Sequence, residues 1–72
     1  MTDQKFLKII AQNLKSARAR AGLRQADVEE KIGLTLRHYQ SIEAGKVNVT
    51  ALTLLHLASL FKVKPEELLR AP

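Results

Sequence analysis

Residues 22–46 read GLRQADVEEKIGLTLRHYQSIEAGK, and glycines divide this stretch into two short segments whose apolar residues recur at helical spacing. The first segment covers residues 25–32 and is closed by Gly33, which suits the left-handed cap that often ends a helix. Thr35 can cap the second segment, which stops before the next glycine. Because the connection is so short, the sequence predicts two helices that cross steeply, over about residues 25–44.

Further helical segments flank this pair on both sides. A segment capped by Thr2 or Asp3 precedes the pair, and a segment capped by Thr50 follows it. Pro65 suits the first position of a last helix. The sequence therefore predicts an all-α fold of five helices, with a helix-turn-helix formed by helices 2 and 3, in a single domain over residues 1–72.

Length and composition restrict the class of protein. The chain has 72 residues, twelve Lys and Arg against seven Asp and Glu, and no cysteine. A chain without cysteine has neither a disulfide framework nor a thiolate metal site, and its two histidines are too well separated for a zinc knuckle. No stretch approaches the apolar length of a membrane span. We therefore expect a soluble, cytoplasmic protein with no metal, cofactor, membrane partner or evident small-molecule ligand.

No residue pattern points to catalysis. The sequence contains no Ser, His and Asp arrangement, phosphate-binding loop or Gly-rich nucleotide turn. We therefore expect that the protein is not an enzyme.

The segment 35–44 has two different sides. Helical spacing turns Tyr39 and Ile42 towards the inside. Arg pairs with guanine, Gln with adenine, Ser with either, and an apolar edge suits the thymine methyl group. The same periodicity fits a helix that reads DNA bases and an amphipathic helix that only exposes polar residues to water. The pattern therefore leaves both interpretations open. The side chains competent for base readout are Leu36, Arg37, Gln40 and Ser41.

Residues spaced along most of the chain carry a family resemblance. They comprise Leu14 and Arg18, the runs 22–26, 31–35 and 42–46, residues 54–58, Val63, Leu68 and Leu69. From Ile10 to Leu69 the chain resembles the Cro/repressor-type helix-turn-helix domain of the xenobiotic-response-element (Xre) family of bacterial and phage regulators. The resemblance implies a five-helix, lambda-repressor-like domain that regulates transcription by binding double-stranded DNA sequence-specifically, with the recognition helix 35–44 in the major groove.

The resemblance also implies roles for single residues. Gln25 corresponds to a residue that anchors to a DNA phosphate, although a plain N-terminal cap for its helix is the alternative. Arg18 and Glu43 match a structural pair that joins the first helix to the end of the third. Lys46 and Asn48 lie where the family's loop follows the DNA backbone, with ordinary solvated loop residues as the alternative. Arg24 and Thr35 complete the predicted backbone contacts.

Charge within the motif opposes a strong attraction to phosphate. Residues 1–24 hold six bases and one acid, whereas residues 25–45 hold two bases and four acids. Phosphate contacts supply most non-specific affinity for DNA. Asp27, Glu29 and Glu30 must therefore point away from a bound duplex.

Two residues depart from the family pattern. Glu29 stands where the family usually has Ala at the helix crossing, so its carboxylate either escapes to solvent or pairs with a nearby base. Tyr39 replaces the usual Ile or Val, and its hydroxyl needs a partner or must reach the surface.

Leucines beyond those needed for the core indicate an interface. Leu52 and Leu55 lie outside the main apolar stripe of their helix, and Leu68 and Leu69 follow near the end of the chain. The resemblance implies that this interface forms a two-fold homodimer, with packing of the same leucines against the first helix as the alternative. A protein-interaction module on the same fold, such as an antitoxin or an adaptor that masks another regulator, is the alternative function.

Overall fold

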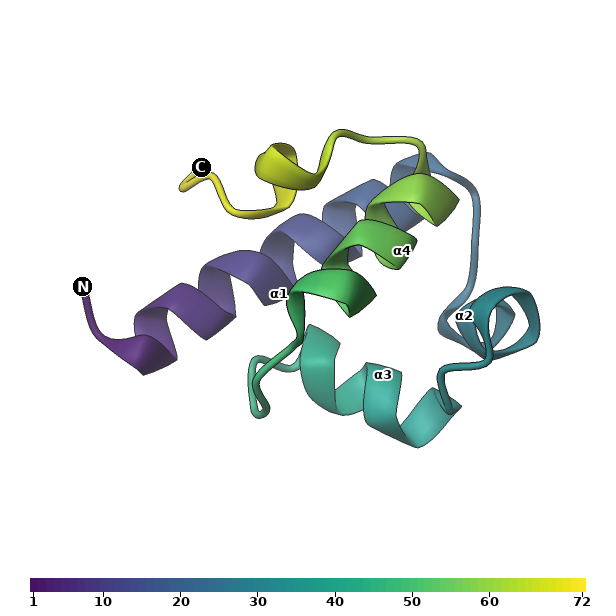
Figure 1. Cartoon of the computed structure of the whole chain (residues 1–72), viewed down its shortest axis with the longest axis horizontal. Helices are drawn as coiled ribbons and strands as arrows, with labels where there is room; N and C mark the ends of the chain where they lie inside the picture. Colours follow the sequence, from purple (N-terminus) through teal and green to yellow (C-terminus); the bar gives the residue numbers. More distant parts are fainter.

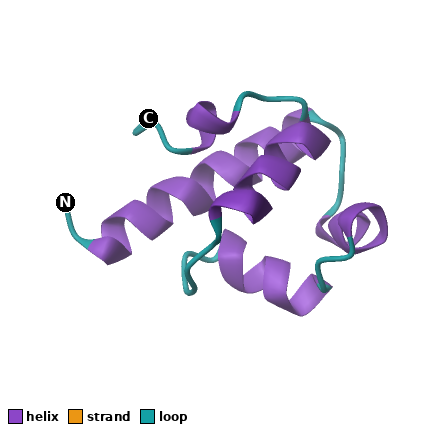
Figure 2. Ribbon diagram, in the orientation of Figure 1, coloured by secondary structure: helices purple, strands orange, loops and turns teal.

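Helices account for all the regular structure of the computed structural model, which describes residues 1–72 (Figure 2). The all-α class predicted from the sequence is confirmed. The elements are α1 (Asp3–Arg20), α2 (Gln25–Ile32), α3 (Leu36–Glu43), α4 (Ala51–Phe61) and the short 3₁₀-helix η1 (Pro65–Leu68).

The long helix α1 runs through the molecule and contacts α3, α4 and η1 (Figure 1). Helix α4 lies beside α1, while α3 crosses below them and α2 stands at the end where α1 finishes. Helices α2 and α3 pack against each other, as expected for the steeply crossing pair. Both ends of the chain lie at the opposite end of the long axis from α2.

Threonine precedes three of the four α-helices and caps each one. In each case the side-chain oxygen accepts the backbone N–H three residues later, which satisfies one of the free donors at the helix start. The capping residues are Thr2, Thr35 and Thr50, with N···O distances of 3.2, 3.2 and 3.1 Å. Helix α2 starts differently, because Arg24 is its N-cap residue and the Asp27 carboxylate accepts the Arg24 N–H at 2.7 Å.

The end of α3 packs closely against α1 at Gly45. This glycine has a φ of 72°, and a Cβ at its position would stand 3.2 Å from the Cγ of Lys8. The Gly45 N–H donates to the Ile42 carbonyl, and the Lys46 N–H donates to the Ser41 carbonyl. The left-handed turn therefore closes the helix and lets two backbones approach, and both demands favour glycine.

Apolar residues from every helix meet in one core. Tyr39 and Phe61 pack edge to face, with their ring centroids 6.4 Å apart. Leu14 is fully buried, and its truncation to alanine would cost about 2–5 kcal/mol by the usual magnitude for a core leucine. The remaining core residues are Ile10, Ala17, Val28, Ile42, Val49, Leu57, Ala58 and Leu68.

The predicted count of five helices is not confirmed, because the structure has four α-helices and its last segment forms a four-residue 3₁₀-helix. Pro65 occupies its first turn as expected. The Asn13 side chain of α1 donates to the carbonyls of Leu68 and Arg70, at 2.9 and 2.7 Å. These carbonyls thus find partners on α1 instead of in a longer helix. No helix of the structure has both the length and the apolar character needed to cross a membrane.

Candidate nucleic-acid interface

Helix α3 has a buried side and an exposed side. Tyr39 and Ile42 are buried in the core, at 0% and 2% exposure. Arg37 and Gln40 are exposed on the helix, and Leu36 and Ser41 are half-buried. The Ser41 hydroxyl donates to the Arg37 carbonyl at 3.3 Å within the helix. The structure therefore turns outward the two long polar side chains that the sequence assigns to base contacts.

The start of α3 holds two capping groups. The Thr35 side chain accepts the N–H of His38, so its hydroxyl hydrogen is free to be donated outward. The Glu29 carboxylate, from α2, accepts the N–H of Leu36 at 3.2 Å. Glu29 is exposed, and it bonds a backbone donor of the next helix instead of a basic side chain. A carboxylate at the positive N-terminal end of a helix is stabilising. This effect accounts for the charged Glu29 where α2 and α3 cross.

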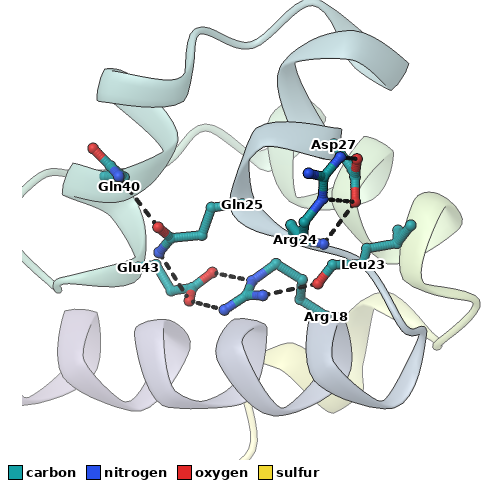
Figure 3. Close-up of polar contacts among 7 residues, drawn as sticks. All are labelled: Arg18, Leu23, Arg24, Gln25, Asp27, Gln40 and Glu43. Carbon is teal, nitrogen blue, oxygen red and sulfur yellow. Dashed lines mark hydrogen bonds and ion pairs between the residues drawn. The ribbon is translucent and has the colours of Figure 1, made fainter.

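A chain of polar contacts links α1 to the exposed side of α3 (Figure 3). Arg18 makes a two-pronged pair with Glu43, from Nε to Oε2 at 3.0 Å and from Nη2 to Oε1 at 2.8 Å. Its Nη1 donates to the Leu23 carbonyl at 2.8 Å. The Gln25 amide donates to Glu43 Oε1 at 3.2 Å, and the Gln40 amide donates to Gln25 Oε1 at 3.3 Å. The expected Arg18 and Glu43 pair is present and extends to Gln40.

The partly buried environment changes the pKa values of Arg18 and Glu43. Burial raises the pKa of Glu43, but the hydrogen bonds from Arg18 and the Arg18 charge outweigh it and bring the pKa below its ordinary value. The hydrogen bond to Glu43 raises the pKa of Arg18. Both groups are therefore charged at neutral pH, and with side-chain exposures of 15% and 4% they are well shielded from water.

The hydroxyl of Tyr39 lies in the core next to this pair. It is buried and makes no hydrogen bond of standard geometry. Burial is the main cause that raises the pKa of Tyr39, and the neighbouring Glu43 carboxylate raises it further. The hydroxyl therefore does not reach the surface, and the polar group that it faces is the carboxylate of Glu43.

Gln25 does not cap α2, so that alternative is wrong. Arg24 occupies the N-cap position, and Gln25 is the first helical residue. Gln25 uses one amide hydrogen towards Glu43, which leaves the second one unused. Arg24 is 80% exposed and pairs with Asp27 at 2.9 Å. The hydrogen bonds from Arg24 lower the pKa of Asp27, so this carboxylate is occupied within the protein.

Lys46 and Asn48 lie in the loop between α3 and α4. Both are exposed, and their side chains make no hydrogen bond or ion pair within the protein. Their position after α3 agrees with the loop that the sequence assigns to the DNA backbone, and contact with DNA stays a prediction.

Leu68 was one of four leucines predicted to form a dimer interface, and this prediction is wrong. Leu68 is 1% exposed and belongs to the core, where η1 packs against α1 and α4. The packing alternative therefore holds for this residue. Leu52, Leu55 and Leu69 are 67%, 45% and 42% exposed and remain available at the surface.

Sequence reasoning missed two contacts between distant parts of the chain, and only the second lies at this surface. The Asn13 side chain makes two hydrogen bonds to the C-terminal segment, with residues that lie 55 and 57 positions further along the chain. The Gln25 and Gln40 amides meet across the two helices of the motif. The sequence singles out Gln25 and Gln40 separately. The steep crossing predicted for their two helices is the signal that could have placed them together.

Comparison with known proteins agrees with this architecture. Residues 14–68 match the family model described as helix-turn-helix. The chain is 34% identical over 61 residues to an uncharacterized HTH-type transcriptional regulator, y4dJ, of Sinorhizobium fredii (strain NBRC 101917 / NGR234), covering 85% of this chain and 79% of that protein. No solved structure matches significantly. On these grounds the chain belongs to the Xre-type helix-turn-helix family of transcriptional regulators.

Proposed function

We propose that the protein regulates transcription by inserting α3 into the major groove of a specific double-stranded DNA site. The observation that carries this proposal is the division of α3, where Arg37 and Gln40 are exposed while Tyr39 and Ile42 anchor the opposite side in the core. A helix that enters a groove needs such an anchored inner side and a polar outer side.

Base readout rests on four side chains with different chemistry. Arg37 offers a guanidinium that pairs with O6 and N7 of guanine, and Gln40 offers an amide that pairs with N6 and N7 of adenine. Leu36, half-buried at the start of α3, provides an apolar edge for a thymine methyl group. Ser41 adds a short polar contact, although its hydroxyl already donates within the helix.

We propose that other side chains, around the four base-reading ones, contact the DNA backbone. The unused amide hydrogen of Gln25 and the hydroxyl hydrogen of Thr35 lie at the starts of α2 and α3, where backbone dipoles favour an anion. Arg24, Lys46 and Asn48 are exposed nearby in sequence. Phosphate contacts of this kind fix the register of the helix on the duplex.

The acidic composition of the motif is compatible with this proposal. Three of its four carboxylates are occupied within the protein: Glu43 by Arg18, Asp27 by Arg24, and Glu29 by the N–H of Leu36. Only Glu30 is exposed without such a partner. Most acids of the motif therefore serve its architecture, which leaves Arg37 and Lys46 as unpaired cations for the DNA side.

We further propose a two-fold homodimer through Leu52 and Leu55 of α4, together with Leu69. These leucines are large, apolar and exposed. A dimer would read two half-sites about 34 Å apart on one side of the duplex. A domain this small also gains stability from association.

The binding step is tested directly by selecting duplexes from a random DNA pool and titrating the best duplex with the protein by fluorescence anisotropy at several salt concentrations. We expect affinity to fall steeply with salt, because phosphate contacts release counterions. We also expect the selected duplexes to share a common sequence. A pool that yields no shared sequence would contradict the proposal.

A further inference from the structure

An open groove of about 710 Å³ lies where the C-terminal ends of α1, α2 and α4 come together. The ends of α1 and α4 lie side by side at the α2 end of the molecule (Figure 1). Eight residues line the groove: Arg20, Ala21, Leu23, Lys31, Leu60, Phe61, Lys62 and Val63. None of them belongs to α3 or to the predicted set of DNA contacts.

The floor of this groove is apolar. Leu23, Leu60 and Val63 are half-buried and pack against the core, and Phe61 lies below them at 3% exposure. Half-buried apolar side chains at the bottom of an open groove can bury more surface only if another molecule covers them.

Three cations surround the apolar floor, and no acid does. Arg20, Lys31 and Lys62 are exposed, and none takes part in the two ion pairs of the structure. The Nε of Arg20 donates only to a carbonyl of its own helix, that of Ser16. Each cation lies at the C-terminal end of a helix, where the helix dipole stabilises it. Because three helix ends meet at the groove, the three positive charges lie around it.

Lys62 carries additional backbone strain. Its φ is 59°, and it is the only residue other than glycine with a positive φ. An L-residue in this region is strained relative to the right-handed conformation, a strain that glycine avoids. The fold thus holds a lysine at the rim of the groove where glycine suits the backbone better.

We propose that this groove binds an acidic segment of a partner protein that inserts a leucine-like side chain between Arg20, Lys31 and Lys62. Charge complementarity selects acidic residues around that side chain, and the apolar floor selects the side chain itself. A DNA backbone satisfies only the first of these requirements, since phosphates and sugars offer no large apolar group. Because the groove shares no residue with the predicted DNA contacts, a partner bound here leaves Arg37 and Gln40 free.

The probe for the test is a short, fluorescently labelled synthetic peptide in which glutamates flank two leucines. Binding is followed by anisotropy, and the contacted residues are mapped by amide chemical shifts. We expect saturable binding that weakens with salt, with shifts centred on residues 20–23 and 60–63. A peptide with serines in place of the leucines, and one with glutamines in place of the glutamates, should each bind at least about tenfold more weakly.

Protein variants locate the site. The pair Lys31→Gln and Lys62→Gly removes two charges from the rim, and the glycine also relieves the strained backbone, so the fold is retained. This variant should bind the glutamate peptide about tenfold more weakly and bind DNA as the wild type does. The matched control, Lys5→Gln with Lys15→Gln, removes two exposed charges from α1 outside the groove and should bind the peptide like the wild type.

Three results would overturn the proposal. The first is that the glutamate peptide causes no saturable change in the amide chemical shifts of the groove residues. The second is equal binding of the serine peptide, which would reduce the interaction to unspecific charge attraction. The third is a loss of DNA affinity and of salt dependence in the Lys31 and Lys62 variant, which would make these cations phosphate contacts. The first two results do not depend on whether the protein binds DNA, so a failure of this proposal can be told apart from a failure of the proposed function.

Discussion

The amide of Gln40 donates to the side-chain oxygen of Gln25 over 3.3 Å, so the first residue of α2 holds a predicted base-reading residue of α3. Gln25 is itself fixed by its hydrogen bond to Glu43. An amide bound through one hydrogen keeps its carbonyl oxygen and its second hydrogen for other partners. The orientation of Gln40 is therefore set before DNA arrives, which lowers the cost of ordering it on binding.

Replacing Gln25 with alanine should relax base preference at one position. Without its partner, the Gln40 amide can rotate, so discrimination at the base pair that Gln40 reads should fall by about 1 kcal/mol or more. Discrimination at the base pair read by Arg37 should stay unchanged. The measurement is anisotropy on duplexes that differ by single base pairs, with Gln12→Ala, an exposed residue of α1, as the control. A uniform loss on every duplex would show that Gln25 acts only through a phosphate.

Removing the charge of Glu43 should destabilise the domain strongly. Glu43→Gln leaves the partly buried guanidinium of Arg18 without its counter-charge, and this loss should cost up to about 3–5 kcal/mol, the usual magnitude for a fully buried pair. The measurement is urea denaturation of the variant and of Glu30→Gln, an exposed acid of α2. Equal stability of the two variants would contradict the role of the pair.

The same pair predicts how wild-type stability depends on pH. The pKa of Glu43 in the folded state is below its ordinary value of about 4.5, so the unfolded chain binds the proton more readily. The contribution of Glu43 is therefore fully present above that ordinary value and is lost as the pH falls through the lower, folded-state pKa. Urea denaturation across this acid range should show a loss of stability that is smaller in Glu43→Gln.

Replacing Asn13 with aspartate should loosen the end of the chain. A carboxylate cannot donate to the carbonyls of Leu68 and Arg70 that the Asn13 amide now binds. We expect a loss of about 1–3 kcal/mol in the free energy of unfolding, with faster hydrogen exchange around η1. Gln12→Glu, the same chemical change at the exposed neighbouring residue, should have little effect. An unchanged stability in the Asn13 variant would contradict this account of the C-terminal segment.

Leu52→Glu should separate the proposed dimer. Leu52 is 67% exposed, so the charge costs the monomer little but opposes burial in an interface. Sedimentation at micromolar concentration should give a dimer for the wild type and a monomer for the variant. A monomer in both cases would remove the dimer from the account.

The helix limits were predictable because they depend on local chemistry. Thr35 and Thr50 cap the helices that follow them through hydrogen bonds that span three residues. Gly33 adopts the positive φ expected at the end of α2. The buried side of α3 followed from the same local periodicity, which turned Tyr39 and Ile42 inward.

Contacts between distant segments were not predictable in the same way. Leu68 and Leu69 are adjacent and chemically identical, yet one is buried and the other exposed. Their difference in exposure depends on how the last segment packs against α1 at Asn13. Neither the periodicity nor the composition of the sequence predicts that contact. The bond from Glu29 to the N–H of Leu36 likewise depends on the crossing of α2 and α3.

The most direct test of the central proposal is the base dependence of Arg37→Ala. Affinities of the wild type, of this variant and of the control Lys15→Ala are compared on the selected duplex and on duplexes with single base-pair changes. We predict that Arg37→Ala loses about 1–3 kcal/mol on the selected duplex and nothing on the duplex whose base pair for Arg37 is changed. An equal loss on every duplex, or no loss on any, would contradict the reading of DNA by α3.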